Sequence, residues 1–229
     1  MVRLKPIAHI KSDFPEKFGI PRQSGLVGGA KASVVFEEEY RNPEALRGLE
    51  GFSHIWIIWG FSANKRDGWS PTVRPPKLGG NTRVGVFASR SPYRPNAIGM
   101  SPVKLDAIEY NAEAGPVLHI SGGDMMDGTP VYDIKPYVPT DSLPEAITGF
   151  AEAPGGAHLQ VQMNREKLGA IPDGDIAVIC ALLREDPRPA YHNDPERVYG
   201  MNYKEYEIKF NVSGNILRVM DIRTADKQD

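Results

Sequence analysis

The sequence predicts a mainly β protein, a sandwich or a barrel, followed by a small α+β unit. Short runs rich in β-branched and aromatic residues recur through the first two thirds of the 229 residues. Turn residues separate these runs at fairly regular spacing, and no long amphipathic helix intervenes, which argues against a parallel α/β sheet. After residue 139 comes a stretch rich in Pro, Gly and Ala. We therefore expect a β domain over residues 1–139, a linker over 140–156 and an α+β domain over 157–229.

The first domain begins with two predicted strands, at residues 3–10 and 31–36. A single helical turn is expected at residues 43–48, because Asn42 is a favoured N-cap, Pro43 suits the first helical position and Gly48 is a stop signal. The run SHIWIIWGF at residues 53–61 has the composition of a central strand. Further short strands are expected at residues 82–88, 103–110, 117–121 and 131–138.

The second domain combines strands with one helix. Residues 157–163 alternate as a strand does, and residues 175–184 have helical character, with Asp173 a possible N-cap after Pro172. Strands at residues 203–210 and 216–220 flank the sequence Ser-Gly-Asn, which is a hairpin turn of the expected type.

Composition and charge argue against several classes of protein. A net charge of −2 argues against a binder that uses its whole surface for nucleic acid, although clustered positive charge still suits phosphates. The single cysteine, Cys180, excludes an internal disulfide and lies in an apolar run, as a buried inert thiol does. No apolar run approaches the roughly 20 residues that cross a bilayer, and the N-terminus lacks signal-peptide features. We expect a cytoplasmic protein without a membrane segment.

Common catalytic motifs do not occur. The chain has no H-E-x-x-H, no G-x-S-x-G elbow, no phosphate-binding P-loop and no G-x-G-x-x-G after a strand. The five histidines are scattered without metal-ligand spacing, so no metal is expected. A binding site is therefore expected on loops that a β scaffold positions.

The most informative loop covers residues 85–104, GVFASRSPYRPNAIGMSPVK. It contains Arg90, Arg94 and Lys104, and no Asp or Glu occurs between residues 68 and 105. Prolines at positions 92, 95 and 102 restrict the backbone, while glycines at 85 and 99 allow turns. A rigid, positively charged loop of this kind is suited to hold an anion.

Three other loops carry polar groups. Residues 18–27, FGIPRQSGLV, are either an ordinary surface loop or a set of polar contacts. Residues 122–135, GGDMMDGTPVYDIK, are either a β-turn with aspartates as turn formers or a backbone cradle with a carboxylate. Residues 186–191, DPRPAY, present Arg188 on a rigid piece after the helix, either as a structural clasp or for binding.

Together these segments resemble the TrmO family, also called TsaA or YaeB, of β-barrel tRNA methyltransferases. The matching pieces span residues 17 to about 191 in the order of the family: KFGIPRQSGLV, LRGLEGFSHIWIIWGF, WSPTVRPPKLGGNTRVGVFASRSPYRPNAIGMSPVKL, DMMDGTPVYDIKPY and DPRPAY. Ala97 stands where relatives usually have proline, and the C-terminal hairpin matches more loosely.

The resemblance implies a fold, a reaction and partners. The fold would be a small antiparallel TsaA-like barrel that binds S-adenosylmethionine, with an added C-terminal domain. The reaction would transfer the methyl group of S-adenosylmethionine to N6 of N6-threonylcarbamoyladenosine at tRNA position 37. The working unit would be a homodimer, and the partner would be the anticodon arm of tRNA.

The resemblance also implies a cofactor pocket. Cofactor contacts would come from Gln23, Ser24, Gly25, Ser62, Ala63, Arg90, Asp124, Met125, Met126, Asp127, Gly128 and Thr129. We further expect, from the chemistry of these side chains, that the catalytic group comprises Arg90, Tyr93, Asn96 and Asp127. On the same grounds, RNA contacts would come from Arg74, Lys77, Arg83, Arg94, Lys135 and Arg188.

Physical chemistry suggests what these groups do. We expect Arg90 to pair with the methionine carboxylate or to orient the RNA, and Tyr93 and Asn96 to hold the target base by stacking and amide hydrogen bonds. Arg94 or Lys135 would meet the threonine carboxylate. The proton on the attacked nitrogen would leave to Asp127, to Asp133 or to water.

Two other functions fit the same residues. One is a barrel that binds S-adenosylmethionine or RNA without turnover. The other is a methyltransferase that acts on a small carboxylate or phosphate metabolite, with the basic loop holding that acceptor.

Overall fold

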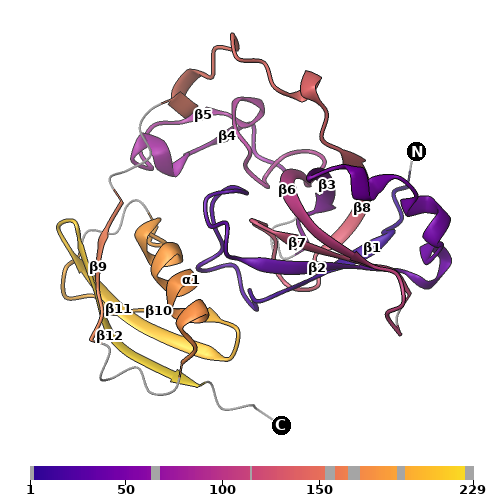
Figure 1. Cartoon of the computed structure of the whole chain (residues 1–229). Coiled ribbons are helices and arrows are strands. Elements are labelled where there is room, and N and C mark those ends of the chain that lie inside the picture. The colour runs from indigo at the N-terminus through magenta and orange to yellow at the C-terminus, as the bar shows by residue number, and fades with distance from the viewer. Residues whose placement is uncertain are drawn as a thin grey trace. The chain divides into compact units, whose positions relative to one another are not determined.

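Six antiparallel strands of the computed structural model close into a barrel in the order β1-β2-β7-β6-β3-β8 (Figure 1). Their bounds are β1 Ala8–Ser12, β2 Lys31–Phe36, β3 His54–Gly60, β6 Ile98–Glu109, β7 Val117–Ser121 and β8 Pro130–Pro136. The structure describes residues 3–62, 68–113, 115–152, 158–164, 171–189 and 194–224. The expected antiparallel barrel is thereby confirmed.

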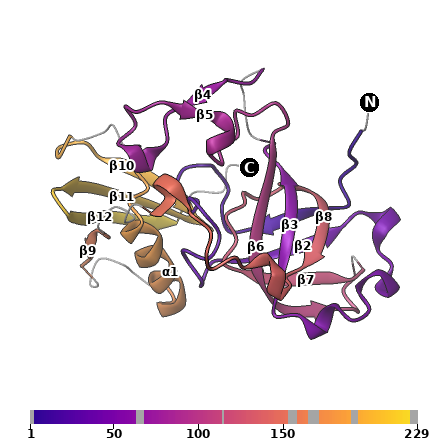
Figure 2. The ribbon, with the colours of Figure 1, turned by 90° about the horizontal axis from the view of Figure 1, so that it is seen from above.

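Alternate side chains of each strand point inward and fill the barrel. On β3, Ile55 and Ile57 are fully buried, and Trp59 is 7% exposed. β6 lies beside β3 in the view from above (Figure 2), and the two strands pair with Trp59 opposite Gly99 and Ile57 opposite Ser101. These inward residues pack with Ile10, Val34, Leu118, Ile120, Met125 and Val131 in one hydrophobic core.

Gly99 is required by this packing. A Cβ atom at Gly99 would lie 2.3 Å from Cε2 of Trp59, well inside van der Waals contact. The indole therefore rests directly on the backbone of β6, and no larger residue fits there.

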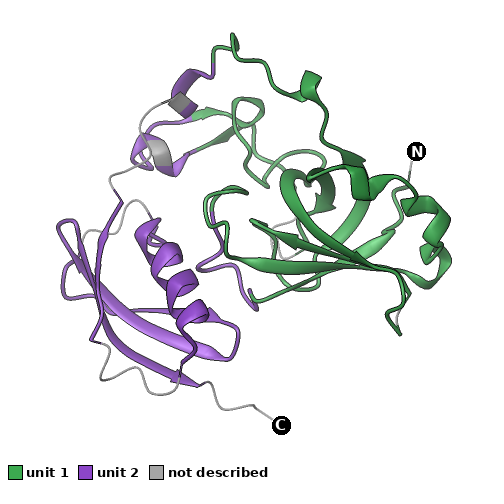
Figure 3. Cartoon of the chain, in the orientation of Figure 1, with its two compact units in different colours: residues 1–13, 22–73, 84–147 green, residues 14–21, 74–83, 148–229 purple. Residues whose placement is uncertain are grey.

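Two compact units divide the chain (Figure 3). The first comprises residues 1–13, 22–73 and 84–147, and the second comprises residues 14–21, 74–83 and 148–229. The first unit holds the barrel and a short ladder between β4 (Thr72–Val73) and β5 (Val84–Gly85). The division therefore does not follow a single cut in the sequence, because two short early segments cluster with the C-terminal residues.

The second unit contains a four-stranded sheet in the order β10-β11-β12-β9 and the helix α1. The bounds are β9 Gln160–Gln162, α1 Asp173–Arg184, β10 Tyr199–Tyr203, β11 Tyr206–Ser213 and β12 Ile216–Thr224. β9 is parallel to β12, and the other pairs are antiparallel. Helix α1 buries Ile179, Leu182 and Leu183.

An early segment of the chain also belongs to the second unit. The ring of Phe14 lies 5.8 Å from that of Tyr203, and the side chain of Asn202 donates a hydrogen bond of 2.9 Å to Glu16. A Cβ at Gly19 would overlap Met201, so Gly19 lets the segment approach β10 closely. Residues 14–21 therefore pack on a strand almost 190 positions later in sequence.

Several local patterns predict the observed elements well. The strands at residues 31–36 and 117–121 have the predicted bounds. The predicted helical turn is a 3₁₀ turn at Pro43–Leu46, where Asn42 Oδ1 accepts the backbone N–H of Glu44 at 3.0 Å. The Ser-Gly-Asn hairpin connects β11 to β12, with Gly214 at a φ of 60°. Other 3₁₀ turns are Glu38–Tyr40, Leu49–Gly51, Pro76–Leu78, Val86–Ala88, Pro139–Asp141 and Gly149–Glu152.

Other expectations are wrong in detail. The strand predicted at residues 82–88 is only Val84–Gly85, followed by a 3₁₀ turn. β6 begins at Ile98, five residues before its predicted start, and β1 begins at Ala8 instead of residue 3. Asp173 is the first helical residue and Pro172 occupies the N-cap, so the proposed Asp173 cap does not form. Within the described ranges, no helix has the length and apolar character needed to cross a membrane.

Candidate functional site

The antiparallel order of the barrel brings three connections to one end. β1 and β7 finish at this end, and β2 and β8 begin there, because Ser12 pairs with Ala32 and Lys31 pairs with Ser121. β3 also ends there, where Gly60 pairs with Ile98 at the start of β6. The segments at residues 22–30, 61–62, 84–97 and 122–129 therefore lie at the same end of the barrel. These loops carry most of the site residues predicted from the sequence.

Two glycines join the first and the last of these loops. The backbone N–H of Gly25 donates to the carbonyl of Gly122 at 2.8 Å, and Gly122 N–H donates to Ala30 at 2.9 Å. Both glycines have left-handed backbones, with φ values of 83° and 74°. A side chain at either position would be strained, so glycine permits the two loops to pair. Gln23 and Ser24, which precede Gly25, are thereby placed beside the turn at residues 122–129.

The turn at residues 124–129 is fixed to β1. Gly128 N–H donates to Ile10 at 2.8 Å, and Ile10 N–H donates to Thr129 at 2.9 Å. Ser12 contributes two bonds of 3.0 Å, from its N–H to Oδ1 of Asp127 and from its Oγ to the carbonyl of Met125. The Met125 side chain is 2% exposed and packs in the core, so this residue offers backbone and no apolar surface to a ligand.

Asp124 lies at the centre of the converging loops. Its Oδ1 accepts a hydrogen bond of 2.6 Å from Ser101 Oγ, and the backbone N–H of Ser24 also donates to it. Burial raises the pKa of Asp124 above its ordinary value, although the bonds from Ser101 and Ser24 and the charge of Arg90 act in the opposite direction. The carboxyl is thus partly withdrawn from water and oriented by fixed donors, as a recognition group should be.

Sequence reasoning missed the support beneath Asp124. Ser101 is 1% exposed, and its Oγ also accepts the indole N–H of Trp59 at 3.0 Å. A chain of hydrogen bonds therefore runs from the core tryptophan through Ser101 to the carboxyl. The alternation of Gly99, Ser101 and Val103 on the inward face of β6 is the signal that predicts this, once the strand is known to start at Ile98.

Arg90 is exposed and belongs to a braced loop. Ser89 N–H and Oγ both donate to the carbonyl of Val86, at 3.1 and 2.9 Å. Nη1 of Arg94 donates to the carbonyl of Ser89 at 2.9 Å and to that of Ser91 at 3.4 Å. Arg94 thereby stiffens the loop from within, while the positive charge of Arg90 acts on Asp124. The predicted role of Arg94 toward a carboxylate stays a prediction.

The residues predicted to hold the target base are accessible. Tyr93 is 36% exposed, and Asn96 is exposed on the approach to β6. Backbone bonds fix both, from Ser70 N–H to Tyr93 at 3.0 Å and from Ile98 N–H to Asn96 at 2.8 Å. Ser62 follows β3 at the same end of the barrel, whereas Ala63 lies outside the described residues.

The six predicted RNA contacts fall in both units. Arg94 and Lys135 belong to the first unit, and Lys135 Nζ lies 2.8 Å from Oδ2 of Asp133 on the same strand. The others belong to the second unit: Arg74, Lys77, Arg83 and Arg188. Arg188 donates to both carboxylate oxygens of Asp186, at 2.8 and 2.9 Å, and its side chain is 11% exposed. Arg188 is thus paired within its own segment, and its predicted role toward RNA stays a prediction.

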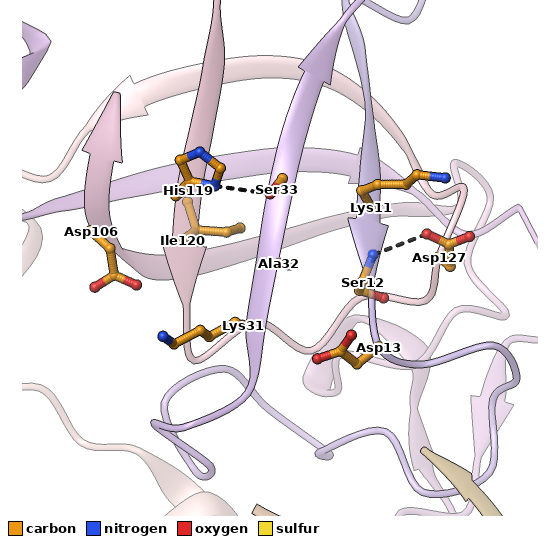
Figure 4. Close-up of a pocket in the computed structure, with 10 residues that line it drawn as sticks. All are labelled: Lys11, Ser12, Asp13, Lys31, Ala32, Ser33, Asp106, His119, Ile120 and Asp127. Atoms are coloured by element: carbon orange, nitrogen blue, oxygen red, sulfur yellow. Dashed lines mark hydrogen bonds between the residues drawn. The ribbon is translucent and has the colours of Figure 1, made fainter. Parts of the chain in front are cut away.

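A cavity of about 530 Å³ opens on the barrel (Figure 4). β1, β2 and β7 contribute most of its lining, and Ser33 and His119 point toward each other across neighbouring strands, 3.2 Å apart. Of the predicted cofactor residues, Asp127 lines it. The sequence analysis missed the remaining lining: Lys11, Ser12, Asp13, Lys31, Ala32, Ser33, Asp106, His119 and Ile120.

The chemistry around Asp124 fits S-adenosylmethionine. A carboxyl with fixed orientation accepts hydrogen bonds from hydroxyl or amine groups, and a nearby exposed arginine can pair with a carboxylate. Asp127 and Asp133 are held differently, since Asp127 accepts from Ser12 and Asp133 pairs with Lys135. Among the residues that the structure describes, no cluster of His, Cys, Asp and Glu has the arrangement of a metal site.

The chain is similar to known proteins over most of its length. Residues 9–142 match the family model of the tRNA-methyltransferase O N-terminal domain, and residues 157–225 match the TrmO C-terminal domain. The tRNA (adenine(37)-N6)-methyltransferase of Escherichia coli strain K12 is 39% identical over 92% of this chain and 93% of that protein. A Pseudomonas aeruginosa protein named putative S-adenosylmethionine-dependent methyltransferase RcsF is 39% identical over 97% of this chain and 98% of that protein. The crystal structure of TrmO from P. aeruginosa has a TM-score of 0.78 at 33% identity, covering 98% of both chains.

Proposed function

The chain belongs to the tRNA-methyltransferase O family, and on that premise we propose that it methylates N6 of adenosine 37 in tRNA with S-adenosylmethionine. The acceptor is N6-threonylcarbamoyladenosine at that position. One observation carries the proposal: the loops around Ser24, Arg90 and Asp124 meet at one end of the barrel, with the carboxyl of Asp124 held by Ser101 and Ser24. The same end presents Tyr93 and Asn96, which suit an unpaired base.

The residues around Asp124 would hold the cofactor. Asp124 would accept hydrogen bonds from the ribose hydroxyls or the adenine amine, and Arg90 would pair with the methionine carboxylate. When bound, S-adenosylmethionine would supply a methyl group on a sulfonium for in-line displacement by the nitrogen, with the neutral thioether S-adenosylhomocysteine as the leaving group. The backbone bonds that fix Gly25, Gly128 and Thr129 keep this end of the barrel rigid. Rigid alignment is the main contribution a protein makes to such a displacement.

The target nitrogen carries a proton that must leave. Asp127 is the candidate base, because it lies on the turn next to Asp124 and its Oδ1 is oriented by Ser12 N–H at 3.0 Å. Its carboxylate retains acceptor capacity after that bond. Asp133 is the weaker candidate, since its Oδ1 accepts from Ile134 and its Oδ2 lies 2.8 Å from Lys135.

The test is methyl transfer to defined acceptors. The purified chain is incubated with labelled S-adenosylmethionine and tRNA from a strain that lacks the activity, and the nucleosides are identified by mass spectrometry. The matched control is the same tRNA without the threonylcarbamoyl group. We expect methylation of the modified tRNA alone. Binding without transfer would establish a binding module, and transfer to small carboxylates or phosphates instead would establish a metabolite methyltransferase.

We also propose that the protein works as a homodimer in the cytoplasm. Ile98 and Met100 are 37% and 49% exposed on the outer face of β6, and burial of such a face stabilises a dimer. Light scattering on the wild type and on Met100→Glu measures the association. A dimer in the wild type that dissociates in the variant is expected; a wild-type monomer with full activity would reject the dimer.

A further inference from the structure

Two large aromatic side chains are exposed near the β4–β5 ladder. Trp69 is 53% exposed and Phe87 is 73% exposed. Their ring centroids are 6.4 Å apart and the ring planes differ by 18°, so the rings stack almost in parallel. Rings of this size bury much apolar surface when covered, and leaving two of them together in water is unfavourable. The pair therefore has the character of a contact surface.

The backbone around the pair is fixed. β4 and β5 pair through Thr72 and Gly85, and Val86 N–H donates to the carbonyl of Pro71 at 3.0 Å. Val86 is 1% exposed, so the 3₁₀ turn is anchored on one side while Phe87 faces out on the other. The rings are consequently presented by an ordered support, which lowers the entropy cost of binding a flat ligand.

The pair is continuous with the loop that carries the candidate base-binding residues. Ser70, next to Trp69, donates its N–H to the carbonyl of Tyr93 at 3.0 Å. Tyr93 is itself 36% exposed. The segment from residue 68 to residue 105 contains no Asp or Glu, whereas Arg90 lies exposed within it. Exposed aromatic faces on a segment that carries arginine and no acidic residue are a combination that unpaired nucleic acid binds.

We propose that Trp69 and Phe87 form a stacking platform for an unpaired nucleobase that neighbours the methylated adenosine in the anticodon loop. This inference rests on the proposed function, because it takes tRNA as the substrate. Tyr93 would contact the target base, and the platform would hold a second base of the same loop. The platform would read no sequence, since every base has a stacking face. It would instead supply affinity and keep the loop splayed open for the reaction.

The proposal favours RNA over a second copy of the chain on grounds of charge. A protein partner would need acidic groups to match the basic segment, whereas RNA supplies phosphates next to every base. Apolar contact and charge neutralisation would then act together over a few nucleotides. A second copy covering the rings is one of the outcomes distinguished below.

The experiment measures binding of the full chain to an anticodon stem-loop RNA that carries threonylcarbamoyladenosine, and separately to the same RNA with an abasic residue beside the target. The variants are Trp69→Ala, Phe87→Ala, the conservative Trp69→Phe, and Phe52→Ala as a control at an aromatic residue that is 37% exposed outside the basic segment. Methyl transfer by the wild type is recorded first, so that failure of the proposed function is seen independently of the platform.

We expect each alanine variant to lose about 5-fold to 150-fold in affinity for the intact RNA, from the usual contribution of one base stacked on an aromatic ring. Trp69→Phe should retain most of the affinity, and Phe52→Ala should match the wild type. The wild type should bind the abasic RNA more weakly than the intact RNA. Each alanine variant should bind the abasic and the intact RNA with equal affinity. Affinity for S-adenosylmethionine should be unchanged in all variants.

Two results would overturn the platform. One is unchanged RNA affinity in both alanine variants. The other is a change of oligomeric state in light scattering that accounts for the lost affinity, which would assign the rings to a second copy. If the wild type transfers no methyl group yet the variants lose RNA affinity as expected, the proposed function fails while the platform stands.

Discussion

Replacing Ser101 with alanine tests whether the barrel core orients the carboxyl of Asp124, the proposed contact to the cofactor. The substitution removes one hydroxyl that is 1% exposed and makes two hydrogen bonds, one from Trp59 at 3.0 Å and one to Asp124 at 2.6 Å. The indole N–H is left without this acceptor inside the barrel, and the carboxyl loses a donor. Each loss costs about 1–3 kcal/mol. Because both bonds share one atom, we expect a combined loss of about 2–4 kcal/mol in the free energy of unfolding.

Intrinsic fluorescence reports this loss selectively. The three tryptophans all lie in the first compact unit, so urea unfolding followed by their emission measures the barrel. Calorimetric titration with S-adenosylmethionine measures the functional consequence. The matched control is Ser33→Ala, since Ser33 is a half-buried strand serine whose Oγ lies 3.2 Å from Nδ1 of His119 on the outer face. We expect the control to cost less than about 1 kcal/mol and to leave binding unchanged.

The same substitution changes the ionisation of Asp124. The hydrogen bond from Ser101 lowers the pKa of Asp124, so its loss raises that pKa further above the ordinary value. Cofactor affinity should then decline at a higher pH in the variant than in the wild type as the solution is acidified. Equal stability losses in Ser101→Ala and Ser33→Ala, together with unchanged cofactor affinity, would refute the reasoning.

The remaining predictions concern single positions. Gly99→Ala places a Cβ against the indole of Trp59 and should cost about 1–3 kcal/mol in urea unfolding; wild-type stability would reject the close approach. Asp124→Asn should abolish cofactor binding by calorimetry. Burial raises the pKa of Asp124, so stability from this group is present below pH 3.8 and lost as pH rises through its folded pKa. Stability of the variant relative to the wild type should therefore increase as pH rises from about 4 through the folded pKa of Asp124 in pH-dependent unfolding. Arg90→Ala should lower turnover strongly in the transfer assay with little change in melting temperature, whereas the exposed Arg47→Ala should alter neither.

Strand prediction succeeds where turns bound a regular alternation, and fails where prolines interrupt it. β2 and β7 have clear limits in the sequence, and their predicted bounds are confirmed. The start of β6 contains Pro102, which suggests a loop. The structure tolerates Pro102 because β7 pairs with β6 only from Lys104 onward. On that edge of β6, the position of Pro102 therefore needs no backbone hydrogen bond to a neighbouring strand.

Predictions about individual side chains depend on the phase of a strand. With β6 taken to start at residue 103, Ser101 belongs to a loop and has no predicted direction. In the structure it faces inward between Gly99 and Val103. The exposure of Phe87 could not be predicted from the sequence either. The predicted strand at residues 82–88 ends after Gly85 in the structure, and the 3₁₀ turn that follows directs the ring outward. The loops themselves are marked in the sequence by proline, glycine and clustered charge.

Gly99 links the core of the barrel to the geometry of the reaction. A shift of one residue between β3 and β6 would place Met100 beneath Trp59 and turn Ser101 away from Asp124. The indole accepts only a glycine at that place, so the packing of Trp59 selects one register. That register also sets where β6 begins. It therefore sets where the loop with Arg90 and Tyr93 joins the barrel relative to the carboxyl of Asp124. Alignment of cofactor and base would then depend on a contact in the core, which substitutions in the loops alone would not reveal.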